Sequence, residues 1–247
     1  MKVWLRNWDV FLKTYKVNFL PPFLEPLLYL FALGFGLGTF IADIQGVSYA
    51  RFIAPALIAI SIMNSSFFEC TFSSYVRMYY QKTYDAIIST PLNIDEVIAG
   101  ELLWGATRSL INTIIMLPVI AAFGLIELPV SLLIIPFSFL GGLLFASVAM
   151  CFTAISPNIT ALNYPAFLFV TPMFLFSGTF FPLSVLPQQV QYFALTVLPL
   201  THVVMFVRSL TLGTPTVHLL FNLAWIVVVT TLFFVLSVNL MKKRLIN

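Results

Sequence analysis

Charged residues are scarce in this sequence. Only 9% of its 247 residues are Asp, Glu, Lys or Arg, whereas about a quarter of an average soluble domain is charged. Because the surface of a soluble globule needs polar cover, this scarcity excludes most soluble folds. The net charge of +3 is also too small and too scattered to form a nucleic-acid footprint.

Cysteine and histidine are equally rare. Cys70 and Cys151 lie inside apolar stretches without CxxC or histidine-rich spacing, so we expect two buried thiols rather than a disulfide framework or a metal site. A serine protease of the membrane needs a histidine on a span beside its serine. The two histidines, His202 and His218, lie in an outer segment and at the start of the last expected span, and no GxSxG occurs.

The sequence also lacks the residues that other functional classes need. Phosphatase or glycosyltransferase chemistry would need a charged cluster at one interface, and the outer connections hold only the scattered Asp43, Arg51, Glu127 and Arg208. No span has the ring-forming polar face or filter of a channel. None of the six lysines follows a glycine, so the chain has no phosphate-binding loop. We assign no catalytic residue, and energy must come from another polypeptide.

Apolar residues, by contrast, make up 60% of the chain, including 26 phenylalanines, and the mean hydropathy is +1.01. A bilayer is crossed by about 20 apolar residues in a helix. The sequence therefore predicts an all-α, polytopic membrane protein with six transmembrane helices in a single domain. We expect the spans near residues 22–42, 52–72, 97–123, 129–155, 161–181 and 217–241.

The N-terminal residues predict a surface helix. Over residues 1–19, aromatic residues such as Trp4, Trp8 and Phe11 share one helical face, with charged residues between them, as in helices that lie in the headgroup plane. No cleavable signal pattern occurs. With both termini placed in the cytoplasm, nine of twelve basic residues fall on the inner side, as the positive-inside rule requires. They are Lys2, Arg6, Lys13, Lys16, Arg77, Lys82, Lys242, Lys243 and Arg244.

Two connections are longer than the rest. The inner segment 73–96 predicts a short amphipathic helix that stops at Pro91, after which Asn93 and Glu96 form a capping pair for the next helix. The outer segment 182–216 is strongly apolar but punctuated by Pro182, Pro187, Pro199 and Pro215. Short helices that dip into the outer leaflet fit this pattern, because irregular backbone at that depth must be buried in protein.

Three runs carry a family resemblance: residues 23–38 (FLEPLLYLFALGFGLG), residues 82–110, and residues 174–210 with their SGTFFP turn and proline-punctuated apolar segment. Together they resemble the membrane subunit of ABC-2 type transporters over nearly the whole chain. The chain is most similar to the NodJ branch, the permeases that pair with NodI-type ATPases in lipo-oligosaccharide export. It is less similar to drug-export permeases of the daunorubicin type.

The resemblance implies a permease in a bacterial inner membrane that dimerises and binds two NodI-like ATPase subunits, which hold ATP and Mg. No cofactor is implied for this chain itself. Its cargo would be a lipo-oligosaccharide or a lipid-linked saccharide, with drug or antibiotic export as the alternative and an intramembrane enzyme as a more distant one. The inner helix would couple to the ATPase through Tyr84, Asp85, Ala86, Ile87, Ile88, Ser89, Thr90 and Pro91. Its alternative is a helix lying on the membrane surface.

Charges within spans need partners or a cavity. Glu25 either gains from a helix N-terminus or contacts substrate. Glu101 and Arg108, seven residues apart, predict a structural pair that bonds through a neighbour or to other spans, and Glu69 has the same role with Arg77.

The resemblance places spans one and five beside the pathway at the dimer interface. There Gly34 and Gly38 form a GxxxG pattern for close helix packing. Aromatic faces stack on sugars and tolerate acyl chains, although most of these rings would face lipid or other helices. The substrate-path residues are Glu25, Tyr29, Phe35, Tyr164, Phe174 and Phe176.

Overall fold

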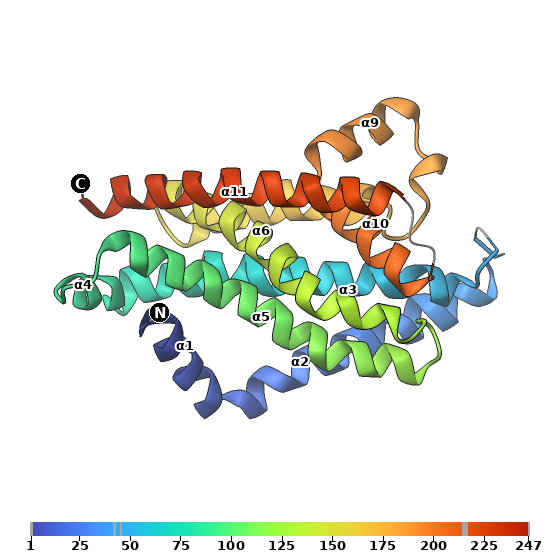
Figure 1. Cartoon of the computed structure of the whole chain (residues 1–247), viewed down its shortest axis with the longest axis horizontal. Helices are drawn as coiled ribbons and strands as arrows, with labels where there is room; N and C mark the ends of the chain where they lie inside the picture. The colour runs from blue at the N-terminus through green and yellow to red at the C-terminus, as the bar shows by residue number, and fades with distance from the viewer. Residues whose placement is uncertain (1, 42, 45, 214–216, 247) are drawn as a thin grey trace.

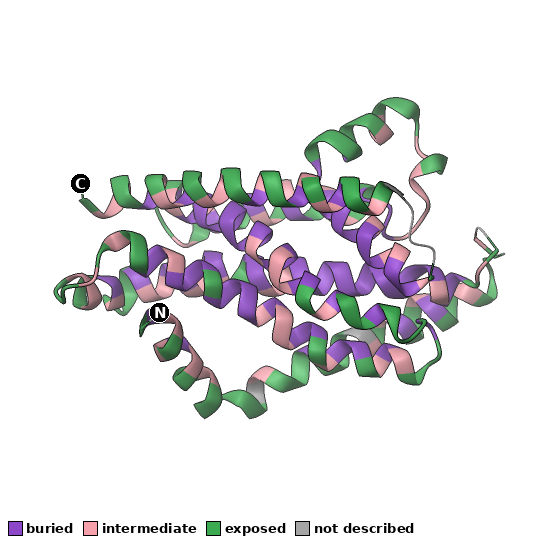
Figure 2. Cartoon of the chain, in the orientation of Figure 1, coloured by how far each residue is buried: buried purple, intermediate pink, exposed green. Residues whose placement is uncertain are grey.

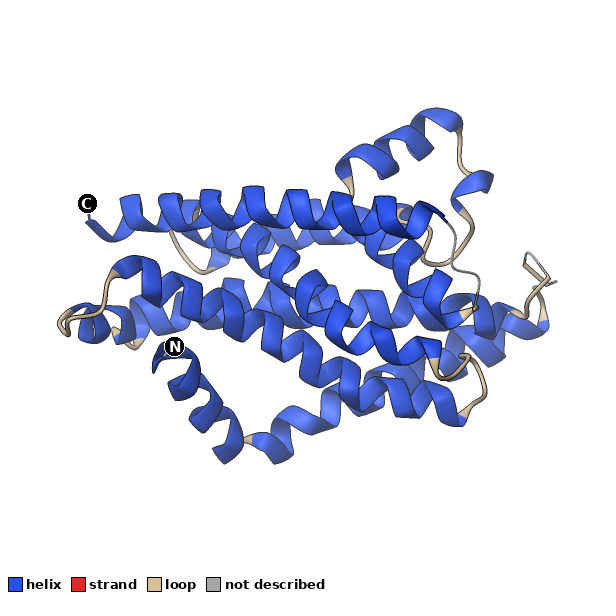
Figure 3. Ribbon diagram, viewed as in Figure 1, coloured by secondary structure: helices blue, strands red, loops and turns tan. Residues whose placement is uncertain are grey.

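The chain folds into a helical bundle (Figures 1 and 3). A computed structural model describes residues 2–41, 43–44, 46–213 and 217–246, and this part contains helices and turns but no strand. Ala42, at the end of the first expected span, and residues 214–216, at the end of the outer segment, lie outside the described residues. The predicted all-α membrane fold is confirmed, because five helices are long and apolar enough to cross a bilayer.

The five long crossings occur in chain order. They are α2 (Tyr15–Tyr29, continued by turns at Leu30–Gly36 and Leu37–Thr39), α3 (Tyr49–Phe68, extended by π-helical turns at Glu69–Ser73 and Val76–Tyr80), α5 (Ile94–Ala122), α6 (Ile134–Ile155, preceded by a 3-10 turn at Val130–Leu133) and α11 (Val217–Ile246). The shorter helices are α1 (Lys2–Lys13), α4 (Thr83–Ile88), α7 (Asn163–Pro165), α8 (Thr171–Phe176), α9 (Gln188–Val197) and α10 (Pro199–Thr211).

A shorter apolar helical segment follows α6. The segment Thr160–Phe176 combines a 3-10 turn at Thr160–Leu162, α7, a π-helical turn at Ala166–Val170 and α8. Its 17 residues are at the lower limit of about 17 for a helix that spans a bilayer. It ends at Phe176 rather than at residue 181, because Gly178 takes a positive φ of 72° and turns the chain.

The two ends of the chain lie at the same end of the bundle, together with α4 (Figure 1). An even number of crossings returns a chain to its starting side, so the five long helices need one further crossing, and the fifth span expected from the sequence falls on Thr160–Phe176. Helices α9 and α10 follow at the opposite end and are bent by 90° relative to each other. This bent pair corresponds to the outer segment expected to dip into the membrane.

The N-terminal helix ends earlier than expected. The sequence predicts one surface helix to residue 19, with a boundary at the Pro21–Pro22 pair, but α1 ends at Lys13 and α2 continues through both prolines. The break lies at Thr14, where the Thr14 hydroxyl donates to the Val10 carbonyl at 3.0 Å and the Asn18 amide donates to the Thr14 carbonyl at 3.0 Å. The Thr14 hydroxyl thus takes the place of the Thr14 backbone N–H, which bonds to Phe11 instead of Val10, and the Asn18 side chain adds to the backbone bond that Thr14 already accepts.

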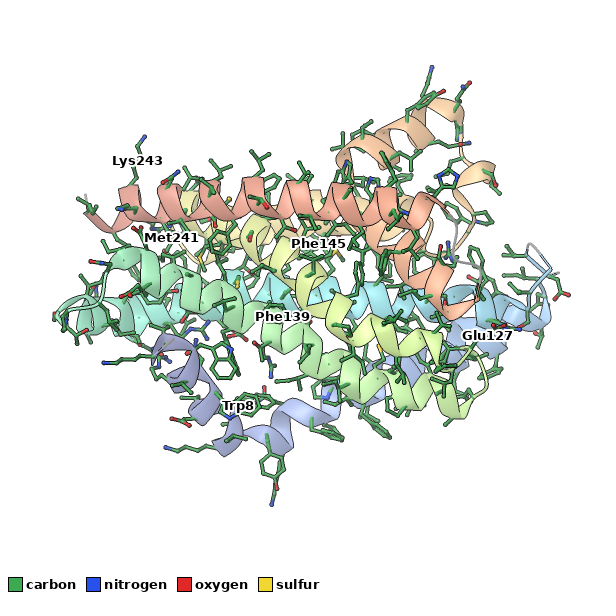
Figure 4. The ribbon with its side chains drawn as sticks, in the orientation of Figure 1. Trp8, Glu127, Phe139, Phe145, Met241 and Lys243 are labelled. Carbon is green, nitrogen blue, oxygen red and sulfur yellow. The ribbon has the colours of Figure 1, made fainter. Side chains whose placement is uncertain are left out.

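Helix α3 forms the centre of the bundle. Every residue from Phe52 to Met63 is buried, and α3 packs against α5, α6 and α10 (Figure 2). Phe145 of α6 is buried in the same core (Figure 4). Helix α11 packs on α6 but leaves an apolar outer face exposed, with Val228 and Leu232 more than half exposed. An exposed apolar face along a span-length helix suits contact with lipid.

Small residues bring α5 and α6 close together. A Cβ atom built on Gly142 would lie 1.7 Å from Ser109 Oγ and 3.2 Å from the Cα of Ala106. The Ser109 hydroxyl donates to the Ser138 carbonyl at 3.0 Å across the same contact. The two backbones thus approach as closely as in membrane helix pairs with glycine at the interface.

We expect Gly142→Ala to destabilise the bundle by about 1–3 kcal/mol, the usual cost of overpacking a core. Ser109 must shift and loses its bond to Ser138, while the Ala106 backbone cannot move away without separating the helices. Unfolding titrated with SDS in mixed micelles measures the change. Gly34→Ala is the control, because its added Cβ would lie at an ordinary 3.4 Å from Ala50 Cβ. Equal losses for both variants would contradict this packing account.

Candidate functional site

The short helix α4 lies between the second and third crossings, as predicted. Lys82, with a left-handed φ of 53°, turns the chain into it. The predicted capping box at the start of α5 is confirmed: the Asn93 side chain accepts from the backbone of Glu96, and the Glu96 carboxylate accepts from the Asn93 backbone at 3.1 Å. Helix α4 is therefore held at both ends by defined turns.

The two faces of α4 differ. Tyr84 is fully buried within the chain, and burial, followed by the nearby Glu101 charge, raises the pKa of its phenol well above the ordinary value. Ile87 and Ile88 are half-buried against the same core. Tyr84 is thus an internal anchor rather than a surface contact. The other residues expected on the coupling surface are exposed, namely Asp85, Ala86, Ser89, Thr90 and Pro91.

A buried charge cluster lies next to α4, where α3 and α5 meet. Glu101 of α5 is fully buried. Its Oε2 accepts from Ser74 Oγ at 3.0 Å and from Arg77 Nε at 3.0 Å, while its Oε1 accepts from Asn7 Nδ2 at 3.0 Å. An ionised carboxylate with this many donors is stabilised by charge-assisted hydrogen bonds.

Glu69 connects Arg77 to the remaining members of this cluster, Trp104 and Arg108. Its Oε1 accepts from Arg77 Nη1 at 2.7 Å and from Trp104 Nε1 at 3.0 Å. Arg108 Nε lies 3.7 Å from Glu69 Oε2. Glu101 and Arg108 therefore do not touch but are linked through Arg77 and Glu69, which is the indirect pairing that their spacing predicts.

Helix α1 covers this cluster. Trp4 Nε1 donates to Thr107 Oγ1 at 2.8 Å, and Trp4 and Trp8 stack on each other and meet Trp104 edge-on at 6.5 Å. Trp8 is labelled on α1 in Figure 4. A Cβ atom on Gly100 would lie 2.8 Å from Val3 Cβ, so α1 is closely packed on α5. The aromatic stripe predicted for a headgroup-plane helix faces α5. Asn7 and Trp104 were missed as members of the cluster, because no local spacing connects residues so far apart in sequence.

The residues expected along a substrate path form two separate groups. Glu25 and Phe35 are exposed and Tyr29 is half-buried on the first crossing. On the Thr160–Phe176 segment Tyr164 is 69% exposed, Phe176 is exposed, and Phe174 meets Phe180 at 4.8 Å. The first crossing packs on α3 and α5, whereas Phe169 packs on Phe67 of α3 and Phe152 of α6. Within one chain, α3 and its neighbours separate the two groups.

The GxxxG glycines pack inside the chain. A Cβ on Gly34 would lie 3.4 Å from Ala50 Cβ, and one on Gly38 would lie 3.7 Å from Tyr49 Cβ. Both glycines therefore face α3 of the same chain. The close helix approach expected from this pattern occurs within one subunit.

Arg208 stabilises the SGTFFP turn at residues 177–182, which we call the outer turn. Its Nη2 donates to the Gly178 carbonyl at 2.9 Å, and its guanidinium lies 4.0 Å from the centre of the Phe52 ring. This contact connects α10, the SGTFFP turn and the start of α3. Nearby, both ring nitrogens of His202 are hydrogen-bonded, to Asn222 at 2.8 Å and to the Leu195 carbonyl at 2.9 Å, so His202 joins α10 to α9 and α11.

Arg208→Met should release the outer turn. The methionine keeps the apolar stem but loses the bond to Gly178 and the contact with Phe52, which together are worth about 1–3 kcal/mol. Limited proteolysis should then cut the 177–187 segment faster. Arg51→Met is the matched control, because Arg51 pairs at the surface with the half-exposed Glu127 at the same end of the bundle (Figure 4). The account fails if both variants are cut at the wild-type rate.

Comparison with known proteins decides what this bundle is. The family model described as ABC-2 type transporter matches residues 1–212. The chain belongs to the ABC-2 type transporter family. It is 35% identical to nodulation protein J of Rhizobium meliloti, over 98% of this chain and 92% of that protein. Nodulation protein J of Sinorhizobium fredii is 33% identical over 99% of this chain and 93% of its own length.

A more distant relative is also a membrane transport permease. The inner membrane transport permease YadH of Escherichia coli K12 is 25% identical over 75% of this chain and 72% of its own length. The chain is thus an ABC-2 permease with several membrane crossings, similar to the nodulation J proteins. The resemblance predicted from the three sequence runs is confirmed.

Proposed function

We propose that this ABC-2 permease couples to a separate ATPase through α4 and exports an amphipathic saccharide, a lipo-oligosaccharide or a lipid-linked saccharide. The main support for this proposal is that α4 has two different sides. One side is anchored in the chain's own core by Tyr84, Ile87 and Ile88, and the other is exposed at the end of the bundle where both termini lie. Such a helix can dock in a partner groove and transmit its movement.

The contacts of α4 suit force transmission. Its buried phenol lies near the Glu101 cluster, which joins α3, α5 and α1 through charge-assisted bonds. Displacement of α4 by a closing partner therefore moves the inner ends of α3 and α5 together. Two NodI-like ATPase subunits, which would hold ATP and Mg, are the proposed partners.

The substrate path in this proposal lies between two copies of the chain. The aromatic residues of the first crossing and those of Thr160–Phe176 are exposed on parts of the bundle that α3 separates. A single path lined by both groups needs a second copy, in which the first crossing of one subunit faces the Thr160–Phe176 segment of the other. The homodimer follows from this requirement.

The proposed orientation puts both termini and α4 in the cytoplasm. Lys2 begins α1, Lys82 directly precedes α4 and Lys243 lies in the last turn of α11, and these parts of the three helices lie at the same end of the bundle (Figure 1). Lys243 points away from the bundle (Figure 4). Cytoplasmic loops of membrane proteins carry the excess of Lys and Arg. The ATPase and its nucleotide are cytoplasmic in this arrangement.

Reconstitution with the partner ATPase tests the function. Proteoliposomes that contain both proteins should move a fluorescent lipo-oligosaccharide in an ATP-dependent manner and should hydrolyse ATP faster when it is present. A cationic drug of similar size is the comparison cargo. Stimulation by the drug alone would replace the saccharide with a drug as cargo. Absence of ATP-dependent movement of either compound would refute the exporter.

A further inference from the structure

A cavity lies between α1 and the inner ends of α3 and α5. Its volume is about 550 Å³, within the range of about 300–1,000 Å³ that is usual for small-molecule sites. Three arginines line it, Arg6, Arg77 and Arg108, from three different helical segments. The apolar part of its wall comes from Val10, Phe11, Phe72, Val76 and Trp104.

The three arginines are not equally paired. Arg77 is bound by both Glu69 and Glu101. Arg108 donates to Asn18 Oδ1 at 3.2 Å and its Nε forms an ion pair with Glu69 Oε2 at 3.7 Å, but neither Nε nor Nη1 has a hydrogen-bond acceptor among the described residues. Arg6 Nη1 is likewise buried without an acceptor, and Arg6 forms no ion pair with the described residues.

The balance of charge around the cavity is positive. Three guanidinium groups stand against two carboxylates, Glu69 and Glu101, and both carboxylates are already engaged by Arg77. Burial lowers the pKa of Arg6, and the nearby Glu101 opposes this shift. A partly buried cation without a counter-charge is costly, so a ligand that supplies acceptors and negative charge would stabilise this site.

We propose that this cavity binds the phosphate group of an amphipathic molecule, with the phosphate between Arg6 and Arg108 and the apolar chain along Val10 and Phe11. Guanidinium forks match phosphate oxygens in paired hydrogen bonds, which a lysine ammonium does not. Thr14, at the bend between α1 and α2, lines the cavity together with Val10, which is also exposed at the surface, so an acyl chain has an apolar route outward along Val10. A membrane phospholipid and free phosphate share this chemistry.

Thermal unfolding of the purified full-length protein in detergent tests the site. Dioctanoyl phosphatidylglycerol should raise the midpoint in a saturable manner, and dioctanoylglycerol, which lacks the phosphate, should not. Inorganic phosphate separates the two sources: protection at the same concentration as the lipid supports a site for the free ion, and protection only at much higher concentration supports a lipid headgroup.

Arg6→Gln is the decisive variant, since Arg6 has no ion-pair partner to lose. The dissociation constant for the phosphatidylglycerol should rise about tenfold or more, with partial recovery in Arg6→Lys. Lys13→Gln, on the exposed side of the same helix, changes the charge equally without touching the cavity and should leave binding within about twofold. Equal binding by the two glutamine variants, or equal protection by dioctanoylglycerol, overturns the proposal. Binding is measured without ATP or cargo, so this result is independent of transport.

Discussion

Glu101→Ala is expected to unfold the inner half of the permease under conditions in which the wild type is stable. Glu101 is fully buried and accepts hydrogen bonds from Asn7, Ser74 and Arg77. Its removal leaves Arg77 with Glu69 as its remaining carboxylate partner among the described residues and leaves the Asn7 amide without its acceptor. Removal of one partner from a buried pair costs about 3–5 kcal/mol, because a buried charge stays uncompensated.

SDS titration of the variant in mixed micelles measures this loss. Helix α1 should be released first, because Asn7 and Trp4 provide its hydrogen bonds to α5. Quenching of the fluorescence of Trp4 and Trp8 by a soluble quencher reports that step. Glu127→Ala is the control: its carboxylate pairs with Arg51 at the opposite end and is half exposed, so the cost is below about 1 kcal/mol. Similar losses in the two variants would show that the buried cluster contributes no special stability.

The charge cluster illustrates how far local spacing predicts contacts. Spacing along one helix indicates which residues share a face. The sequence could therefore predict that Glu101 is associated with Arg108, and Glu69 with Arg77. Spacing contains no information about which distant helix supplies the remaining partner. Asn7 contacts Glu101 although the two residues are 94 positions apart in the sequence. That contact depends on how the bend at Thr14 directs α1 back onto α5.

The helical pattern was equally informative for α4 and equally limited. Pro91 limited how far α4 could extend, and the Asn93–Glu96 capping pair predicted the start of α5, because these residues act through their own backbone neighbours. The pattern placed Tyr84 on an apolar face but did not distinguish a face for another protein from one for the chain's own core. Gly34 shows the same ambiguity, since GxxxG predicts close helix packing without naming the helix.

Ala86→Arg is expected to abolish ATP-dependent transport while the permease stays folded. Ala86 lies on the exposed side of α4, away from the anchor Tyr84. A long charged side chain there does not disturb the chain's own packing, so the free energy of unfolding should stay within about 0.5 kcal/mol. The same side chain prevents close approach of a partner groove. Co-purification of the ATPase should fall at least tenfold, and transport should fall to background.

Gln189→Arg on α9 is the matched control, because it adds the same exposed side chain at the opposite end of the bundle. It should leave ATPase binding and transport unchanged. The alternative for α4, a helix resting on the membrane surface, makes the reverse prediction: an added arginine strengthens attraction to anionic lipid and leaves ATPase binding intact. Retention of the ATPase by Ala86→Arg would therefore favour the membrane-surface helix. Loss of the ATPase from a folded permease requires that α4 itself be the contact.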